Sequence, residues 1–105
     1  MANFIKTVPF ESSFHFFRAL GDSTGVTATS LNEFAGKLQI VPAESVQFHF
    51  QRKDFQKWIK GTIKDEELAE KIDRIKKEIH PNELRKEILR ITQERIIERP
   101  SFRPR

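Results

Sequence analysis

The spacing of apolar and polar positions changes along the chain, and this change predicts where strands give way to helices. From Phe14 to Leu20 the pattern starts with the period of two that is typical of a half-buried strand. Residues 21–25 interrupt it with two glycines around Asp, Ser and Thr, and residues 26–29 are again β-prone. We therefore predict a β-hairpin with its turn at 21–25. A lone hairpin is marginally stable, so helices should cover its apolar face.

The rest of the chain mostly shows the three-and-four spacing of amphipathic helices. Ser30 and Glu33 have the capping-box pattern of a helix start, and Asp54 and Asp65 are predicted to cap two later helices. The apolar stripe after Asp65 continues to Ile79, just before the break at His80-Pro81-Asn82. The helices predicted with these signals span residues 30–41, 54–61, 65–79 and 83–98.

Residues 42–51 are compatible with two kinds of element. Val46, Phe48 and Phe50 alternate with polar residues, which by period alone indicates a strand. Pro42 followed by Ala-Glu-Ser is typical of a helix start, and helices are predicted on both sides. We predict a helix here and keep a strand as the alternative.

The last predicted helix carries two apolar stripes. Leu84, Ile88 and Ile91 share one face, whereas Leu89 and Ile96 lie roughly 100–140° away around the helix axis. A surface helix needs only one such stripe, so the second should contact the N-terminal arm or another copy of the chain. Leu89 and Ile96 are therefore the predicted interface residues.

A chain of 105 residues is about one domain long. We expect a single compact domain over residues 1–98, with residues 1–12 as an extended arm and residues 99–105 as a disordered basic tail. The predicted fold class is α+β and helix-dominated, with an N-terminal β-hairpin packed against four or five short helices. Ten Phe and one Trp should supply much of its core.

Composition limits the possible functions. The chain has no Cys, which removes disulfides, thiolate nucleophiles and Cys-based zinc sites, and no apolar run reaches the roughly 18 residues of a membrane span. We therefore expect a cytoplasmic protein and no membrane partner. Three arginines of the tail account for most of the net charge of +4. Because the body is nearly neutral, nucleic acid is a less favoured partner than protein.

Two of the three histidines, His15 and His49, lie in similar Phe-His-Phe-x-Arg pentads at 14–18 and 48–52. We attribute this similarity to coincidence, and neither histidine has a known catalytic spacing. Both imidazoles with a carboxylate such as Asp54 would make a metal site, and a small molecule bound near them is a further alternative. A hydrogen-bonded structural histidine is the interpretation we favour, with no cofactor and no metal.

The basic residues around Trp58 raise a second possibility. Arg52, Lys53, Lys57 and Lys60 surround this ring in the sequence, as basic residues do in proteins that stack single-stranded bases on aromatic rings. The helical spacing of nearby aromatics is more typical of a core. Nucleic-acid binding through these residues and the tail is therefore an alternative function.

Residues 45–59, with Ser-Leu-Asn-Glu-Phe at 30–34 before them and Asp-Glu-Glu-Leu-Ala at 65–69 after them, resemble an uncharacterised prokaryotic domain family that is common in archaea. The resemblance covers roughly residues 14–79 and supports helix for 42–51. It implies no activity. The polar and aromatic positions that match the family pattern are His49, Arg52, Asp54 and Trp58. A hydrogen bond from His49 or Arg52 to Asp54 would lock two helices together without any ligand.

Helix caps, turns and solvated faces account for the polar residues of the sequence, and none is left over for a catalytic pocket. The sequence therefore predicts a non-enzymatic protein-interaction or regulatory module. The alternatives are nucleic-acid binding near Trp58 and small-molecule or metal binding near His15 and His49. One arrangement would contradict the favoured function: His15, Arg52 and Asp54 lining one deep, wet cavity.

Overall fold

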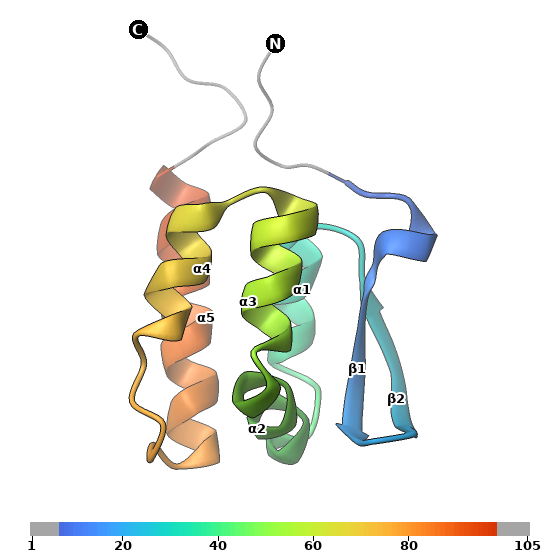
Figure 1. Ribbon diagram of the computed structural model, residues 1–105, viewed down its shortest axis with the longest axis vertical. Helices are drawn as coiled ribbons and strands as arrows, with labels where there is room; N and C mark the ends of the chain where they lie inside the picture. Colours follow the sequence, from blue (N-terminus) through green and yellow to red (C-terminus); the bar gives the residue numbers. More distant parts are fainter. Residues whose placement is uncertain (1–6, 99–105) are drawn as a thin grey trace, which may run out of the picture.

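The computed structural model describes residues 7–98 and confirms an α+β fold in which helices dominate. Figure 1 shows the two-stranded hairpin on one side, α3 in the middle, and α4 and α5 on the other side. The elements, in chain order, are η1 (Phe10–Ser12), β1 (Phe14–Ala19), β2 (Asp22–Ala28), α1 (Leu31–Leu38), α2 (Ala43–Arg52), α3 (Asp54–Trp58), the wide π-type turn η2 (Ile59–Ile63), α4 (Glu66–Asp73) and α5 (Pro81–Glu98).

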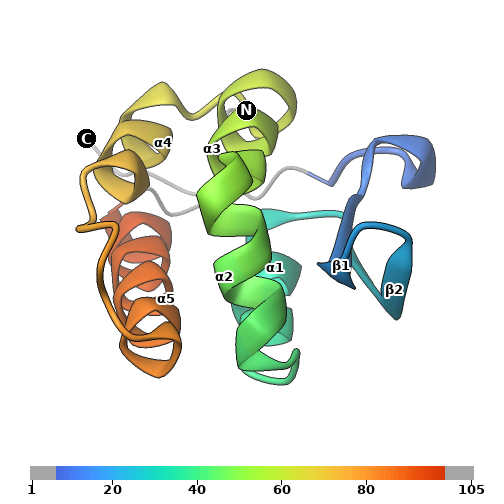
Figure 2. The ribbon, with the colours of Figure 1, turned by 60° about the horizontal axis from the view of Figure 1, so that its bottom comes forward.

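Helix α2 joins the hairpin to the rest of the fold. It packs against β1 on one side and against α5 on the other, and it runs directly into α3 (Figure 2). The predicted helix at residues 42–51 is thus confirmed. The alternation of Val46, Phe48 and Phe50 does not mean a strand, because Val46 and Phe50 lie four residues apart on the buried face of the helix.

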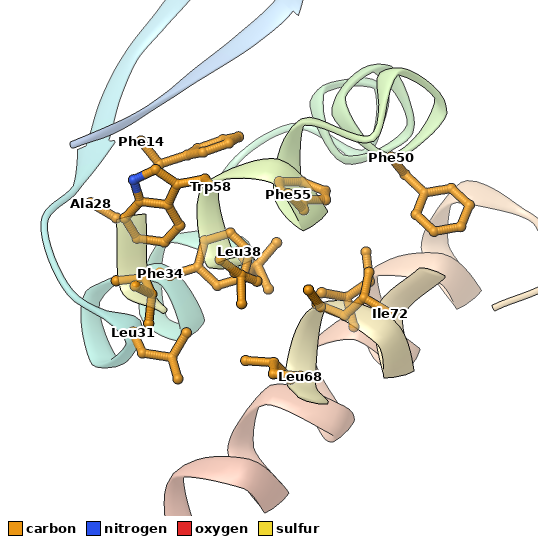
Figure 3. Close-up of a cluster of buried hydrophobic side chains, with 14 of the residues drawn as sticks. Phe14, Ala28, Leu31, Phe34, Leu38, Phe50, Phe55, Trp58, Leu68 and Ile72 are labelled. Carbon is orange, nitrogen blue, oxygen red and sulfur yellow. The ribbon is translucent and has the colours of Figure 1, made fainter. Parts of the chain in front are cut away.

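The core is built from aromatic rings contributed by the hairpin and three helices. Phe16, Phe34 and Phe55 are fully shielded from solvent, and Phe34 lies next to both Phe55 and Trp58, with ring centroids 5.3 and 5.7 Å apart (Figure 3). Each such ring removes roughly 150–250 Å² from water. The packing of these rings fixes the hairpin against α1, α2 and α3.

The hairpin turn differs from the prediction. The strands are connected at Leu20 and Gly21, and residues 22–25 belong to β2. Gly21 and Gly25 both have a positive φ, of 77° and 81°, but they serve different features. Gly21 makes the turn, whereas Gly25 lies where the strand register shifts and where the Thr24 hydroxyl donates to the Phe16 carbonyl at 2.8 Å. The sequence pattern placed both glycines in one turn because a bulge and a turn favour the same residue.

Two of the three predicted caps are confirmed. The Ser30 hydroxyl accepts the Glu33 N–H at 3.1 Å, and the Asp65 carboxylate accepts the Leu68 N–H at 3.2 Å. The Glu33 carboxylate reaches back to the Thr29 N–H at 2.8 Å. This backbone hydrogen bond lowers the pKa of Glu33.

The cap predicted at Asp54 is wrong. Lys53 lies between α2 and α3 with a left-handed φ of 63°, and Asp54 is already the first residue of α3. Its carboxylate makes hydrogen bonds to His49 and Arg52 on α2 and does not cap α3. Asp is a residue type that commonly caps helices, but here its carboxylate accepts hydrogen bonds from His49 and Arg52 across the α2–α3 joint.

Helix α4 is shorter than predicted and ends at Asp73. Ile75 and Ile79 lie in the connection to α5, and both still pack against the core. Their apolar spacing extended the predicted helix because two partly buried residues of a largely exposed connection keep the spacing of a helix face. The chain reverses direction here, since α4 and α5 run side by side in opposite directions (Figure 1).

Part of the predicted arm is described, and the tail is not. Val8 is buried and its N–H donates to the Thr29 carbonyl at 2.8 Å, and the Ser12 carbonyl accepts the Trp58 indole N–H, so Val8 and Ser12 attach the described part of the arm to the body of the domain. Residues 1–6 and the predicted tail at 99–105 lie outside the described residues. Within residues 7–98 every helix is too short or too polar to cross a lipid bilayer.

The second apolar stripe of α5, Leu89 and Ile96, packs within the domain. Leu89 and Ile96 are half-buried and pack against the core, and α5 contacts α1, α2 and α4. Ile96 faces residues of α1 across a shallow surface groove. The second surface that the stripe required is therefore largely the domain itself, and Ile97 is the residue of this region that remains mostly exposed, at 76%.

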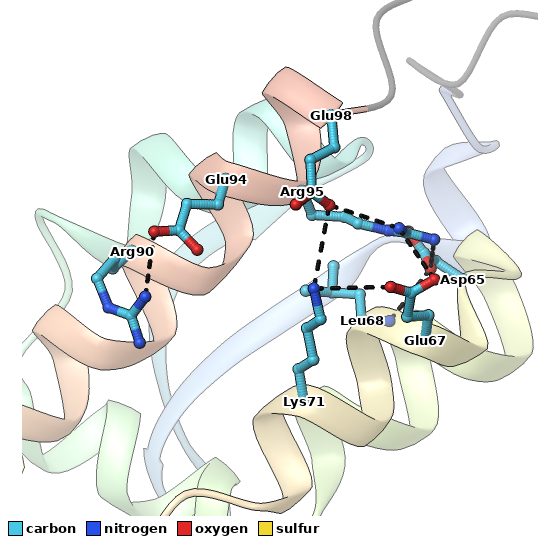
Figure 4. A network of polar contacts seen from close by, with 8 residues as sticks. All are labelled: Asp65, Glu67, Leu68, Lys71, Arg90, Glu94, Arg95 and Glu98. Carbon is cyan, nitrogen blue, oxygen red and sulfur yellow. Dashed lines mark hydrogen bonds and ion pairs between the residues drawn. The ribbon is translucent and has the colours of Figure 1, made fainter.

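A nearly buried ion pair joins α5 to the start of α4. The Arg95 guanidinium donates two hydrogen bonds to the Asp65 carboxylate, each 2.9 Å long, and it also lies 3.2 Å from the Glu67 carboxylate (Figure 4). These acidic groups raise the pKa of Arg95. The same carboxylate that caps α4 thus fixes the C-terminal part of α5.

Candidate functional site

A hollow of about 540 Å³ lies between the hairpin and the α2–α3 joint. This volume falls in the range of roughly 300–1,000 Å³ that is usual for ligand sites. We call it the hairpin groove. Its lining residues are Phe14, His15, Phe17, Leu20, Gly21, Phe48, His49, Arg52, Asp54, Lys57 and Trp58.

The walls of the hairpin groove are largely apolar. Phe17 from β1 and Phe48 from α2 are half-buried, and Leu20 at the hairpin turn is 79% exposed. Phe14 and Trp58 are buried and form part of its base. The groove is open to solvent and not an enclosed cavity, so an apolar group could enter it from the surface.

The His49 ring at the inner side of the groove is held by both of its nitrogens. The Phe17 N–H of β1 donates to Nε2 at 2.8 Å, so the ring proton lies on Nδ1 and is donated to Asp54 at 2.8 Å. The residue is only 3% exposed. The His49 ring therefore ties the hairpin to α2 and to the first residue of α3.

This arrangement excludes His49 from ordinary base catalysis. An Asp that orients a His is the support found in catalytic triads, but there the opposite nitrogen is free to take a proton. In this domain Nε2 already accepts the Phe17 N–H. Burial also lowers the pKa of His49, more strongly than the hydrogen bond to the Asp54 carboxylate raises it. The neutral ring is thus the form that the fold requires.

Arg52 is fixed in orientation although its side chain is 51% exposed. Its Nε–H donates to Asp54 at 3.0 Å, and its guanidinium carbon lies 5.1 Å from the centre of the Phe48 ring. Neither of its terminal Nη groups makes a hydrogen bond with residues 7–98. The guanidinium is therefore positioned at the groove with donors unused.

Lys57 is the second cation of the groove. It is exposed on α3, and it has no ion-pair partner among the described residues. Its basic neighbours differ, because Lys53 pairs with Asp73 at 2.6 Å and Lys60 lies 3.6 Å from Glu66. The hydrogen bond from Lys53 also lowers the pKa of Asp73. Among these three lysines, Lys57 alone combines a place in the hairpin groove with an unpaired charge.

Trp58 belongs to the core. It is 8% exposed, its indole N–H donates to the Ser12 carbonyl at 2.9 Å, and its ring lies 5.6 Å from that of Phe14. A ring packed in this way offers no face on which a nucleic-acid base could stack. The structure thus supports the core interpretation of this residue.

The four residues of the family-like pattern are brought together, and the expected hydrogen bonds of His49 and Arg52 to Asp54 are both present. His15 lines the same groove from β1, with its Nε2 3.3 Å from the Ser13 hydroxyl. The two similar pentads therefore meet, although one is a strand and the other a helix. They are not a duplicated element.

A deep, wet cavity lined by His15, Arg52 and Asp54 would have contradicted an interaction module, and the structure contains only part of that arrangement. His15, Arg52 and Asp54 do line one hollow. The hollow is open to solvent and its lining is largely aromatic, so it differs from a deep, wet cavity. Within residues 7–98 no three His, Asp or Glu side chains are grouped so that they could hold a metal ion.

Sequence reasoning missed the apolar walls of the groove. Phe17, Leu20 and Phe48 were assigned to strand and helix faces, and their exposure depends on how the hairpin meets α2. One signal was present: Phe48 and Arg52 are four residues apart, which places a cation over an aromatic ring once the segment is a helix. Lys57 was among the basic residues predicted around Trp58, but the sequence could not separate it from Lys53 and Lys60, because which of the three lysines is paired depends on tertiary contacts.

The architecture defines a small α+β domain in which a two-stranded hairpin packs on a helical body. The chain belongs to the family of unknown function DUF5752, whose model matches residues 1–93. This agrees with the expected uncharacterised domain family. No curated protein and no solved structure matches the chain.

Proposed function

We propose that this domain is a non-enzymatic protein-interaction module that binds an apolar segment of a partner protein in the hairpin groove. The observation that carries the proposal is the open apolar groove beside a histidine whose two ring nitrogens are both engaged within the fold. The groove offers binding surface, and the group most similar to a catalytic base serves the structure. A cytoplasmic location stays part of this proposal.

Exposed apolar side chains cluster around the groove. Leu20 projects from the hairpin turn, Phe17 and Phe48 form opposite walls, and Phe10 is exposed beside His15, with their ring centroids 5.8 Å apart. Exposed apolar surface of this kind marks interaction sites, and aromatic anchors in a cleft dominate the affinity of many interfaces. An open groove of about 540 Å³ with such walls suits a peptide segment with one or two apolar anchors.

The proposal is tested by selecting peptides on the intact chain from a random library of 12-residue peptides displayed on phage. Selected peptides are then synthesised and their affinity is measured by calorimetry. We expect Leu20→Asp and Phe48→Asp to abolish binding, because each places a charge in the apolar wall. Amide NMR shifts on peptide addition should concentrate at residues of β1, α2 and α3.

The matched control is Ile40→Asp, which adds the same charge at an exposed apolar residue near the opposite end of α2. Peptide affinity should stay unchanged in this variant. Selection of no peptide, or of peptides that bind the Phe48→Asp variant as well as the unaltered chain, would contradict the proposed function. Thermal unfolding of each variant checks that the fold is intact.

A small organic ligand is a second candidate, because the groove has a volume of about 540 Å³ and brings His15 and His49 together. The same NMR spectra recorded with a library of aromatic fragments would test it. Shifts at Phe17 and Phe48 with fragments, combined with failure of the peptide selection, would favour this candidate. Nucleic-acid binding has less support, since Trp58 is buried and Lys53 and Lys60 are paired.

A further inference from the structure

We infer that the hairpin groove is selective for an acidic segment, in which carboxylate side chains flank the apolar anchor and are bound by Arg52 and Lys57. This inference rests on the proposed function and specifies the chemistry of the partner. The two cations lie on the helical wall of the groove, on α2 and α3, while its apolar wall residues come from both the hairpin and α2.

Arg52 is prepared for a carboxylate before any partner binds. Its Nε is held by Asp54 and its face by the Phe48 ring, so the plane of the guanidinium is fixed and little side-chain freedom remains to be lost. The Nη groups are the edge of the guanidinium that the structure leaves without hydrogen bonds to residues 7–98. A carboxylate can accept two parallel hydrogen bonds from such an edge.

The balance of charge in the groove favours an anionic partner. Asp54 is the acidic residue of the lining, and its charge is offset by Arg52 at 3.0 Å. The charge of Lys57 has no such counterpart within the described residues. A basic segment would therefore meet repulsion, and a neutral segment would leave Lys57 without a partner.

The basic end of the chain itself does not fit this groove. Residues 99–105 contain three arginines and no acidic residue, so they would place like charges next to Arg52 and Lys57. We therefore assign the groove to a segment of another protein. A second copy of the chain as the partner would appear as a dimer when the mass of the intact protein is measured by light scattering, and that result would overturn this assignment.

The decisive experiment uses a selected peptide and its neutral counterpart, in which every Asp and Glu is replaced by Asn and Gln. Both are titrated against the intact chain at low and high salt. We expect the acidic peptide to bind at least about tenfold more tightly at low salt, and the difference to shrink as salt screens the charges.

The protein variants complete the test. Arg52→Gln and Lys57→Gln should each lower the affinity for the acidic peptide by about tenfold and leave the affinity for the neutral peptide nearly unchanged. Arg52→Lys should lose part of the affinity for the acidic peptide, because the planar guanidinium is gone. Lys86→Gln removes one positive charge from an exposed site on α5 and is the matched control. It should bind both peptides as the unaltered chain does.

The outcomes separate this inference from the proposed function. Peptides that need Phe48 but carry no acidic residues, or that bind Arg52→Gln unchanged, would overturn the acidic preference and leave the interaction module standing. Peptides rich in Lys or Arg would overturn it too. Failure to select any peptide dependent on Phe48 would remove both proposals together.

Discussion

At the scale of single residues, the orientation of the His49 ring follows from one hydrogen bond at each nitrogen. Protonation of Nε2 would place two N–H groups face to face, because the Phe17 N–H already points at that atom. The nearby carboxylate of Asp54 favours the charged ring, but burial acts in the opposite direction and has the larger effect on the pKa of His49. The folded state therefore keeps this ring neutral.

The stability of the domain should depend on the protonation of His49. In the unfolded chain the ring has an ordinary pKa of about 6.5, and in the folded chain the pKa is lower. Its contribution is thus complete above about pH 6.5 and is lost as the pH falls below that value, by at most about 1.4 kcal/mol per pH unit. Urea unfolding of the intact chain between pH 8 and pH 5 measures this loss.

The variant His49→Gln should show a weaker pH dependence over the same range, although it is less stable at pH 8. His15→Gln, at an exposed position of β1, is the matched control and should retain the slope of the unaltered chain. An identical slope in His49→Gln and in the unaltered chain would show that another group carries the dependence.

Arg95 shows that a charged residue can belong to the apolar stripe of a helix. It continues the buried face formed by Leu84, Ile88 and Ile91, and its charge is matched by Asp65. Removing one partner of a buried ion pair leaves the other without compensation. We expect Arg95→Ala to lower the free energy of unfolding by about 3 kcal/mol, measured by urea denaturation.

The matched control for this substitution is Arg90→Ala on the same helix. Arg90 pairs with Glu87 and Glu94 at 2.8 and 3.1 Å, but all three side chains are exposed (Figure 4 shows Arg90 and Glu94). Exposed pairs of this kind contribute about 0–1 kcal/mol. A loss in Arg95→Ala no larger than that in Arg90→Ala would mean that the Asp65 pair does not stabilise the fold.

At the scale of the elements, local sequence signals predicted well which helices and strands exist. The hairpin, the capping of α1 by Ser30 and of α4 by Asp65, and the helix at 42–51 all follow from short-range chemistry. The errors occur where tertiary contacts compete with that chemistry. Asp54 makes hydrogen bonds to α2 and does not cap α3, and α4 ends before Ile75 because the chain turns back towards α5.

Substitutions of Gly25 and Gly36 should show that one glycine is needed for its backbone conformation and the other is not. Gly25 in β2 has a φ of 81°, whereas Gly36 lies inside α1 and a Cβ there would meet nothing within 4 Å. We expect Gly25→Ala to destabilise the domain by about 1–3 kcal/mol and Gly36→Ala to stabilise it by about 0.5–1 kcal/mol. Thermal unfolding of both variants gives opposite signs if the bulge needs its positive φ.

At the scale of the whole molecule, the position of α2 between β1 and α5 determines which of its surfaces stay exposed. The hairpin groove arises where the C-terminal end of α2 meets the hairpin, and no single segment of the sequence contains it. The polar residues of the site could be predicted because they match a family-like pattern. Its apolar walls could not, because their exposure depends on the angle between distant elements.

The intramolecular packing of α5 leads to a prediction about self-association. Leu89 packs against the core, so Leu89→Ala should lower the free energy of unfolding by about 2 kcal/mol without changing the mass in solution. Ile97, which is mostly exposed, provides the control: Ile97→Ala should change the stability little. If Leu89→Ala converted a dimer into a monomer of equal stability, that result would support the predicted interface on the Leu89 and Ile96 stripe.

The hairpin turn has a consequence for how this family can diversify. Leu20 and Gly21 border the groove, yet Leu20 is largely exposed and contributes no side chain to the buried core. Changes in the length or composition of this turn would reshape one lip of the groove while leaving the aromatic interior untouched. If the groove binds a partner as proposed, substitutions of Leu20 would therefore change what it binds at little cost to folding, whereas Gly21, with its φ of 77°, has to be kept.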